Sequence, residues 1–128
     1  MKPEQSSAAR KRILVRCDGA PTIGFGHVVR CLALADELRD AHGCEVFFAM
    51  LQGPQGIEQV QEHGYAVFQL SQDGSEAIDE GAWLQALVSD LETQALVLDV
   101  RTNLTVEAIR QIRAQGRLIV TIDDPSDR

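Results

Sequence analysis

Lysine is nearly absent from this sequence, which has only Lys2 and Lys11 in 128 residues. A phosphate-binding P-loop needs a lysine directly after a glycine-rich loop, and neither lysine stands there. A phosphoacceptor receiver domain needs a lysine after its fifth strand, and both lysines come too early in the chain. The shortage of lysine therefore argues against both of these α/β classes.

Long apolar runs are missing as well. No stretch approaches the ~20 apolar residues of a membrane span. The N-terminus, Met1 to Arg12, is polar, and the apolar run after it is only Ile13, Leu14 and Val15. Nothing resembles a secretory signal peptide. We therefore expect a cytoplasmic protein with no membrane span.

Cysteine is scarce and unpatterned. Cys17, Cys31 and Cys44 are an odd number, with no C-x-x-C spacing. This favours reduced, mostly buried thiols over a disulfide framework. His27 and Cys31 share the i, i+4 spacing of a metal-ligand pair, but the sequence offers no further ligands beside them. We therefore expect no metal and no cofactor.

Positive charge is outweighed by negative charge. The net charge of −7 and the pI near 4.8 argue against a nucleic-acid or anionic-membrane surface, where a basic patch is expected. A small anionic ligand stays compatible with this charge, because one local site can oppose the sign of the whole molecule.

Apolar runs and helical patterns alternate along the chain. A chain of 128 residues fits one domain, which we place at 11–128 after a disordered lead-in at 1–10. Several strands are continuous apolar runs, which is typical of a parallel sheet covered on both faces. We predict an α/β fold: a Rossmann-like, doubly wound, parallel five-stranded sheet. The predicted strands are 12–17, 45–51, 65–70, 95–99 and 118–122, and the predicted helices are 27–41, 57–63, 78–91 and 106–114.

Polar residues follow the predicted strands. In a doubly wound sheet, ligands bind outside the carboxyl ends of the strands. Asp18 follows the first strand, Asp99 ends the fourth, and Asp123 and Asp124 follow the fifth. The segment from Gly24 to Arg30 joins the first strand to its helix. For any one of these aspartates a plain loop role is the commoner explanation, but together they predict the rim of a site.

The segment Gly24-Phe25-Gly26-His27 stands at the start of a helix. Glycine lets a ligand approach the backbone closely, and the free N–H groups of the first turn favour an anion such as a phosphate or an oxyanion. As a dinucleotide fingerprint the segment fails, because G-x-G-x-x-G is broken at Val29 and the second strand does not end in an acidic residue. We therefore do not expect NAD.

His27 is the sharper signal in this segment. The dipole at a helix N-terminus favours neutral imidazole, which is a competent general base. Asp18 is placed to orient the ring by accepting its other N–H, and Arg30 lies one turn further along the same face, where it would pair with an anion or an aspartate. The alternative is that His27 is a capping or packing residue.

These residues carry a resemblance to a known family. RCDG at 16–19, IGFGHVVR at 23–30 and LALA at 32–35 closely resemble the start of the pseudaminic-acid pathway UDP-sugar hydrolases and of the related spore-coat polysaccharide biosynthesis proteins. Those enzymes look like two-domain glycosyltransferases of the GT-B type and are similar to MurG. The resemblance is specific in the G-x-G-H-x-x-R segment and covers the whole chain in element order.

The resemblance implies a reaction. The histidine that corresponds to His27 would be the general base that activates water to attack the anomeric carbon, with release of UDP and inversion. It also implies binding roles for Gly24, Gly26 and Asp99. From the residues themselves, we expect Phe25, Arg30 and Asp123 to bind the substrate as well, and Asp18 to be catalytic together with His27. The family tends to have a tyrosine where this chain has Arg101, which leaves the sugar undecided.

The resemblance also implies a second α/β domain that holds most of the nucleotide. This chain stops at Arg128, about where the first domain should end, so we expect a C-terminal GT-B domain or a partner chain to complete it. We expect little activity from the present domain alone. The rival functions are the acceptor-binding half of a GT-B glycosyltransferase and a non-catalytic α/β interaction module.

Overall fold

The computed structural model describes residues 10–18, 26–51, 54–69, 79–99 and 104–122. Within these ranges five strands alternate with helices, as the sequence predicts. The strands are β1 (Arg12–Arg16), β2 (Glu45–Met50), β3 (Ala66–Gln69), β4 (Ala95–Leu98) and β5 (Leu118–Thr121). The helices are α2 (Gly26–His42), α3 (Pro54–Glu62), α4 (Glu80–Asp90) and α5 (Val106–Ala114).

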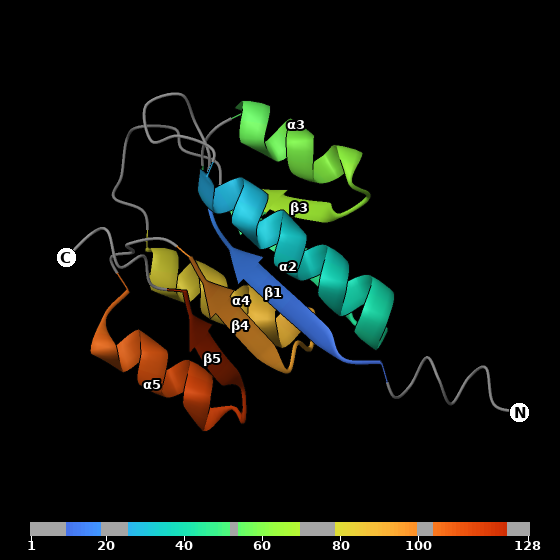
Figure 1. Ribbon diagram of the computed structural model, residues 1–128. Helices are drawn as coiled ribbons and strands as arrows, with labels where there is room; N and C mark the ends of the chain where they lie inside the picture. The colour runs from blue at the N-terminus through green and yellow to red at the C-terminus, as the bar shows by residue number, and fades with distance from the viewer. Residues whose placement is uncertain (1–9, 19–25, 52–53, 70–78, 100–103, 123–128) are drawn as a thin grey trace, which may run out of the picture.

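The five strands form one sheet in the order β3-β2-β1-β4-β5, and every pair of neighbours is parallel. The order reverses between β1 and β4, as it does in a doubly wound fold. The predicted Rossmann-like sheet is therefore confirmed. Each strand ends at the same edge, so the residues that follow β1, β2 and β4 come together there (Figure 1).

Helices cover both faces of the sheet. In Figure 1, α2 and α3 lie on one face, and α4 and α5 on the other. Alternate residues of β1 serve the two layers: Val15 and Cys17 pack with the α2 side, and Leu14 packs with the α4 side. This alternation decides which side of the sheet each polar side chain at the carboxyl edge can reach.

The helix ends follow the expected local chemistry. Thr105 accepts a hydrogen bond from the Ala108 backbone N–H at 3.0 Å, which confirms it as the N-cap of α5. Gly43 has φ +67° directly after α2, and the N–H groups of Gly43 and Cys44 bond to the carbonyls of Arg39 and Leu38. This left-handed turn ends α2 where the glycine predicts it.

The predicted start of α3 is wrong. The segment Gly53-Pro54-Gln55-Gly56 reads as a loop with the helix beginning at Ile57, but α3 begins at Pro54. Proline suits the first position of a helix, where its missing N–H has no intrahelical partner. Gly56 is buried within α3, as is Val60 one turn further on.

The three cysteines are free and buried, as predicted for reduced thiols. Among the described helices, none combines the length and the apolar character that crossing a membrane requires. The lead-in predicted to be disordered at 1–10 lies outside the described residues except for Arg10.

Candidate functional site

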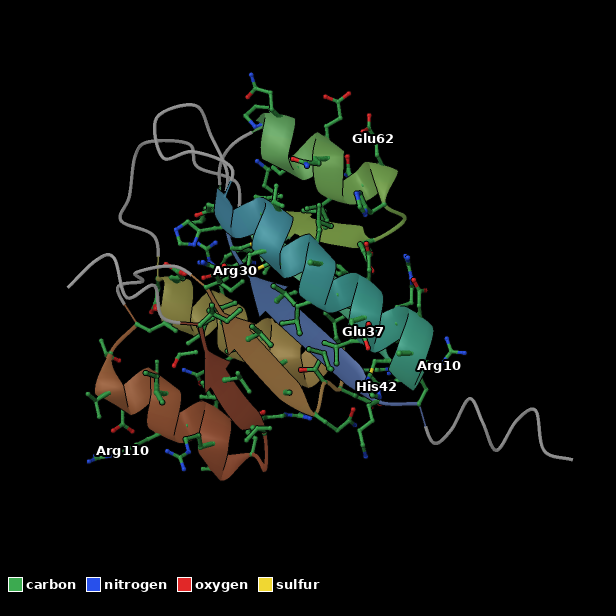
Figure 2. All side chains as sticks on the ribbon, in the orientation of Figure 1. Arg10, Arg30, Glu37, His42, Glu62 and Arg110 are labelled. Carbon is green, nitrogen blue, oxygen red and sulfur yellow. The ribbon has the colours of Figure 1, made fainter. Side chains whose placement is uncertain are left out.

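The first turn of α2 stands at the carboxyl edge of the sheet. His27 lies in this turn, and Arg30 lies one turn further on, near the end of α2 opposite to His42 (Figure 2). The first turn contains no acidic residue. A β-carbon placed on Gly26 would have nothing within 4 Å among the described residues. The spacing of three residues puts His27 and Arg30 on the same face, as the sequence predicts.

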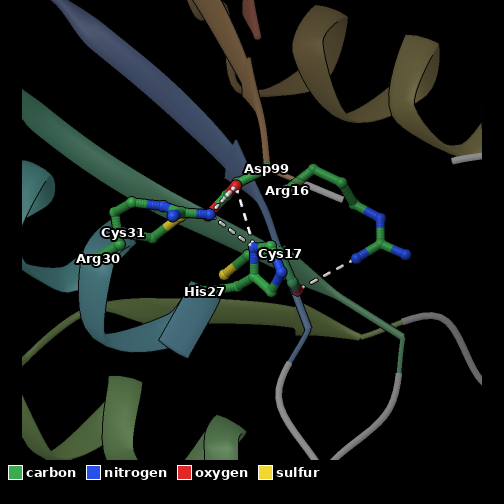
Figure 3. A network of polar contacts seen from close by, with 6 residues as sticks. All are labelled: Arg16, Cys17, His27, Arg30, Cys31 and Asp99. Carbon is green, nitrogen blue, oxygen red and sulfur yellow. Dashed lines mark hydrogen bonds and ion pairs between the residues drawn. The ribbon is translucent and has the colours of Figure 1, made fainter. Parts of the chain in front are cut away.

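His27, Arg30 and Asp99 form a compact cluster (Figure 3). The Nδ1 atom of His27 lies 3.1 Å from Oδ1 of Asp99, and the Nη2 atom of Arg30 lies 2.9 Å from that same oxygen. Arg30 Nη2 is also 2.9 Å from His27 Nδ1, and Arg30 Nε is 3.4 Å from Asp99 Oδ2. The cluster joins the helix after β1 to the residue that follows β4.

Asp99 is the buried centre of this cluster. Its side chain is 1% exposed, whereas those of His27 and Arg30 are 35% and 39% exposed. Besides the two contacts with α2 already named, the thiol of Cys31 donates to Asp99 Oδ2 at 3.2 Å. A buried carboxylate needs such donors because it has lost its water. Asp99 is therefore the buried partner of an ion pair with Arg30, whose side chain is partly exposed to solvent.

The thiol of Cys31 is held in its protonated form. The pKa of Cys31 is raised by the hydrogen bond with Cys17, by burial and by the neighbouring charge of Asp99. The thiolate is the reactive form of cysteine. Cys31 is thus a buried donor to Asp99 and is poorly suited to act as a nucleophile.

The geometry at His27 allows acid–base chemistry. When Nδ1 carries the proton and donates it to Asp99, the lone pair of Nε2 is available to accept a proton. A carboxylate at the far nitrogen is the arrangement that orients a histidine base. The ring is about one-third exposed, so a reacting group can reach it.

Asp18 belongs to a different polar cluster. Its Oδ1 atom lies 2.9 Å from Nη1 of Arg16 and accepts the backbone N–H of Leu51 at 2.8 Å. Arg16 also donates through Nε to Glu80 at 2.6 Å, and its guanidinium lies 5.8 Å from the ring centre of Trp83. These contacts tie β1 to the end of β2 and to the start of α4.

Arg16 is an almost fully buried cation. Burial alone would lower the pKa of Arg16, but the carboxylates of Asp18 and Glu80 outweigh it and raise that pKa. The two acids hold Arg16 on the α4 side of the sheet. The structure thus places Asp99, rather than Asp18, at the Nδ1 atom of His27.

The structure brings together three of the residues expected in the site, His27, Arg30 and Asp99, with Gly26 beside them. Gly24, Phe25 and Asp123 lie outside the described residues. Sequence reasoning missed Arg16, Cys31 and Glu80 as members of these clusters. The signal for Arg16 was present, since a charged residue within an otherwise apolar buried strand needs a buried partner.

A cleft of about 230 Å³ lies at the other end of α2, away from this cluster. Arg39, Gly64 and Tyr65 are among the residues that line it. The guanidinium of Arg39 lies 4.7 Å from the ring centre of Tyr65, and its Nε atom is 2.9 Å from Oδ1 of Asp40. The positive charge of Arg39 is therefore paired within the protein. Among the described residues, no three histidine, cysteine or acidic side chains are arranged to hold a metal ion.

No protein-family model matches the chain. In sequence, it is 24% identical over 115 residues to the uncharacterized protein MJ1062 of Methanocaldococcus jannaschii. That alignment covers 90% of this chain and 22% of MJ1062, so the chain spans less than a quarter of the curated relative that it matches.

Solved structures share the fold at low sequence identity. MurG of Acinetobacter baumannii has a TM-score of 0.64 and 14% identity, over 87% of this chain and 34% of that one. A glycosyltransferase from Rickettsia africae ESF-5 has a TM-score of 0.61 and 7% identity, over 93% of this chain and 32% of that one. The universal stress protein of Archaeoglobus fulgidus has a TM-score of 0.55 and 11% identity, over 95% of this chain and 100% of that one. The chain is thus a Rossmann-like α/β unit whose fold also forms about a third of MurG and of the Rickettsia glycosyltransferase.

Proposed function

We propose that the chain is the N-terminal, sugar-facing half of a nucleotide-sugar hydrolase with GT-B architecture, acting on a UDP-sugar in bacterial surface-polysaccharide or pseudaminic-type sugar biosynthesis. The observation that carries the proposal is the 3.1 Å contact between His27 Nδ1 and the buried Asp99 at the mouth of α2. The fold shared with MurG and the Rickettsia glycosyltransferase supports the architecture. The G-x-G-H-x-x-R segment supports the hydrolase assignment.

In the proposed reaction, His27 is the general base. Its Nε2 atom takes a proton from water, the water oxygen bonds to the anomeric carbon, and the bond from that carbon to the diphosphate oxygen breaks. UDP leaves with the bonding electrons, and the configuration inverts because water enters from the opposite side. Asp99 accepts the Nδ1 proton and keeps the ring in the tautomer that leaves Nε2 open.

The remaining predicted residues have binding roles in this proposal. Gly24, Phe25 and Gly26 would lie against the substrate at the start of α2, where N–H groups favour a phosphate. Arg30 and Asp123 would complete that wall. No cofactor is required, and a second α/β domain or partner chain would supply most of the nucleotide site.

A glycosyltransferase would use the same histidine on a sugar hydroxyl instead of on water. The complete protein should therefore be incubated with nucleotide sugars in the absence of any acceptor. Release of UDP with an equal amount of free sugar supports the hydrolase. Release that requires an added acceptor contradicts it and favours the acceptor-binding half of a transferase.

A second candidate is a non-catalytic interaction module, because the fold that this chain shares with the universal stress protein of Archaeoglobus fulgidus makes up the whole of that chain without a second domain. The two candidates differ at His27. In the enzyme, His27→Ala should lower kcat by roughly 10²–10⁴-fold, the usual contribution of a positioned general base. His42→Ala, at the exposed end of the same helix, is the matched control and should leave kcat unchanged. An unchanged kcat in the His27 variant would show that His27 is not the general base.

A further inference from the structure

Two groups compete for one nitrogen of His27. Asp99 Oδ1 and Arg30 Nη2 lie 3.1 Å and 2.9 Å from Nδ1, and these two atoms are 2.9 Å from each other. We infer that Arg30 holds His27 in the tautomer with the proton on Nε2, and that a diphosphate group draws Arg30 away and so creates the general base. This inference rests on the proposed function and names how that site is switched on.

The competition follows from the chemistry of the three groups. Arginine only donates hydrogen bonds, and an ionised aspartate only accepts them. Nδ1 of a neutral ring either carries a proton, which it donates to Asp99, or presents a lone pair, which accepts from Arg30. It cannot do both. The position of Arg30 therefore determines where the single ring proton resides.

With Arg30 in place, the contacts favour a bare Nδ1. Its Nη2 atom is as close to Nδ1 as to Asp99, so a proton on Nδ1 would bring two N–H groups against each other. Asp99 does not need the histidine in this state, because it already accepts from Arg30 and from the thiol of Cys31. The ring proton then sits on Nε2, and the nitrogen that faces the substrate is a donor.

Arg30 is the member of the cluster that can change partner. Its side chain is 39% exposed, whereas that of Asp99 is 1% exposed. A guanidinium binds phosphate oxygens in a bidentate manner. When Arg30 turns to a diphosphate, Asp99 keeps the Cys31 thiol and gains the Nδ1–H group of His27 as its donor.

The change of tautomer conserves protons, and the imidazole ring stays neutral. One proton passes from Nε2 to water and another returns from water to Nδ1. The base therefore forms only when the group that will leave is bound beside it. This couples substrate binding to activation of the attacking water, and it makes Arg30 a positioning residue that acts through His27.

The test is nitrogen NMR on the 128-residue chain with ¹⁵N-labelled histidine. Spectra are recorded near pH 8.5, about two units above the pKa of histidine in model peptides. The probe is inorganic pyrophosphate, titrated well above the ~1 mM dissociation constant expected for a diphosphate on this chain alone, and compared with sodium chloride at equal ionic strength. His27→Gln identifies the His27 signals among those of the three histidines. Arg30→Met removes the competing donor, and Arg39→Met, further along the same helix, is the matched control.

We expect the Nε2–H tautomer to dominate in the free chain and pyrophosphate to shift the tautomer ratio roughly tenfold toward Nδ1–H, the scale of one hydrogen bond to a charged group. Arg30→Met should show the Nδ1–H tautomer with and without pyrophosphate, and Arg39→Met should behave as the unmodified chain.

Three results would overturn the inference: Nδ1–H dominating in the free chain, a ratio insensitive to pyrophosphate, or the same shift with chloride. Because none of these readouts uses turnover, failure of the hydrolase assay would not be mistaken for failure of the switch.

Discussion

Gly81 of α4 lies directly against Ala108 of α5: a β-carbon on Gly81 would stand 2.9 Å from the Cβ of Ala108. This distance is shorter than two carbon atoms tolerate, so the two helices approach as closely as they do because residue 81 has no side chain. Gly81→Ala should lower the free energy of unfolding by about 1–2 kcal/mol, because overpacking outweighs the gain in helix propensity. Urea denaturation measures the change.

The control for this prediction is Gly26→Ala. A β-carbon there meets nothing within 4 Å, so stability should stay within about 0.5 kcal/mol of the original chain. A stabilising Gly81→Ala would contradict the packing argument, since alanine would then be acting as it does on an exposed helix surface.

The buried cluster of Arg16, Asp18 and Glu80 predicts a large loss of folding stability when Arg16, its only cation, is replaced. Arg16→Met leaves two acids at the carboxyl edge without the charge that compensates them. Breaking a buried ion pair in this way costs about 3–5 kcal/mol. The free energy of unfolding, measured by urea denaturation near neutral pH, should fall by that amount.

Arg12→Met is the matched control, because Arg12 stands on the same strand and pairs with Glu45 at 3.2 Å while both side chains are 42% exposed. An exposed pair contributes at most about 1 kcal/mol. Equal losses in the Arg12 and Arg16 variants would show that burial does not set the strength of these pairs.

The raised pKa of Cys31 predicts a loss of stability in mild alkali. The unfolded thiol loses its proton above about pH 8.5, while the folded thiol keeps it. The unfolded state then binds fewer protons, so stability is full below that pH and falls as the pH rises. One such group lowers the free energy of unfolding by about 1.4 kcal/mol per pH unit.

Cys31→Ser tests this, because serine keeps a donor for Asp99 and does not titrate in this range. The variant should show a shallower fall between about pH 8.5 and 10. Above that range Tyr65 adds a loss of its own, since burial and the hydrogen bond to Asp36 raise the pKa of Tyr65 as well. Identical slopes in the two proteins would refute the assignment to Cys31.

The sheet could be predicted from sequence because its signals are local. Apolar runs mark the strands, and Gly43 marks the end of α2. The site could be predicted only in part. Which aspartate lies beside His27 depends on the order of the strands in the sheet and on the face of the sheet to which each side chain points. Asp18 is nearest to His27 in sequence, but it shares the α4 side with Arg16. Asp99 follows Leu98 on the opposite side and comes from β4, which pairs with β1.

Weak nucleotide binding is expected of the chain alone. The two arginines described at the carboxyl edge, Arg16 and Arg30, are both paired with carboxylates, so a diphosphate binds only by drawing Arg30 away from Asp99, which weakens its binding. Calorimetric titration with UDP should give a dissociation constant of about 1 mM or weaker, or no measurable heat. Binding in the low micromolar range would show that the nucleotide site lies in this half, and the proposed division of the two halves would be wrong.

Asp99 and Asp18 can be separated by their effects on turnover of the complete protein. Asp99→Asn keeps the shape of the side chain but removes the carboxylate at His27 Nδ1. An asparagine amide can donate to Nδ1 and so hold the ring in the wrong tautomer, which in the serine-protease triad costs about 10⁴-fold in kcat. We expect a fall of about 10²–10⁴-fold in kcat.

Asp18→Asn is the comparison, because its carboxylate serves Arg16 and the backbone of Leu51. This variant should lose stability more than kcat when both are measured on folded protein. The reverse order, with kcat falling more in Asp18→Asn than in Asp99→Asn, would return the orienting role to Asp18. It would also mean that the contact between His27 and Asp99 is not the catalytic arrangement, because the carboxylate that orients a base must be the one whose loss slows the reaction.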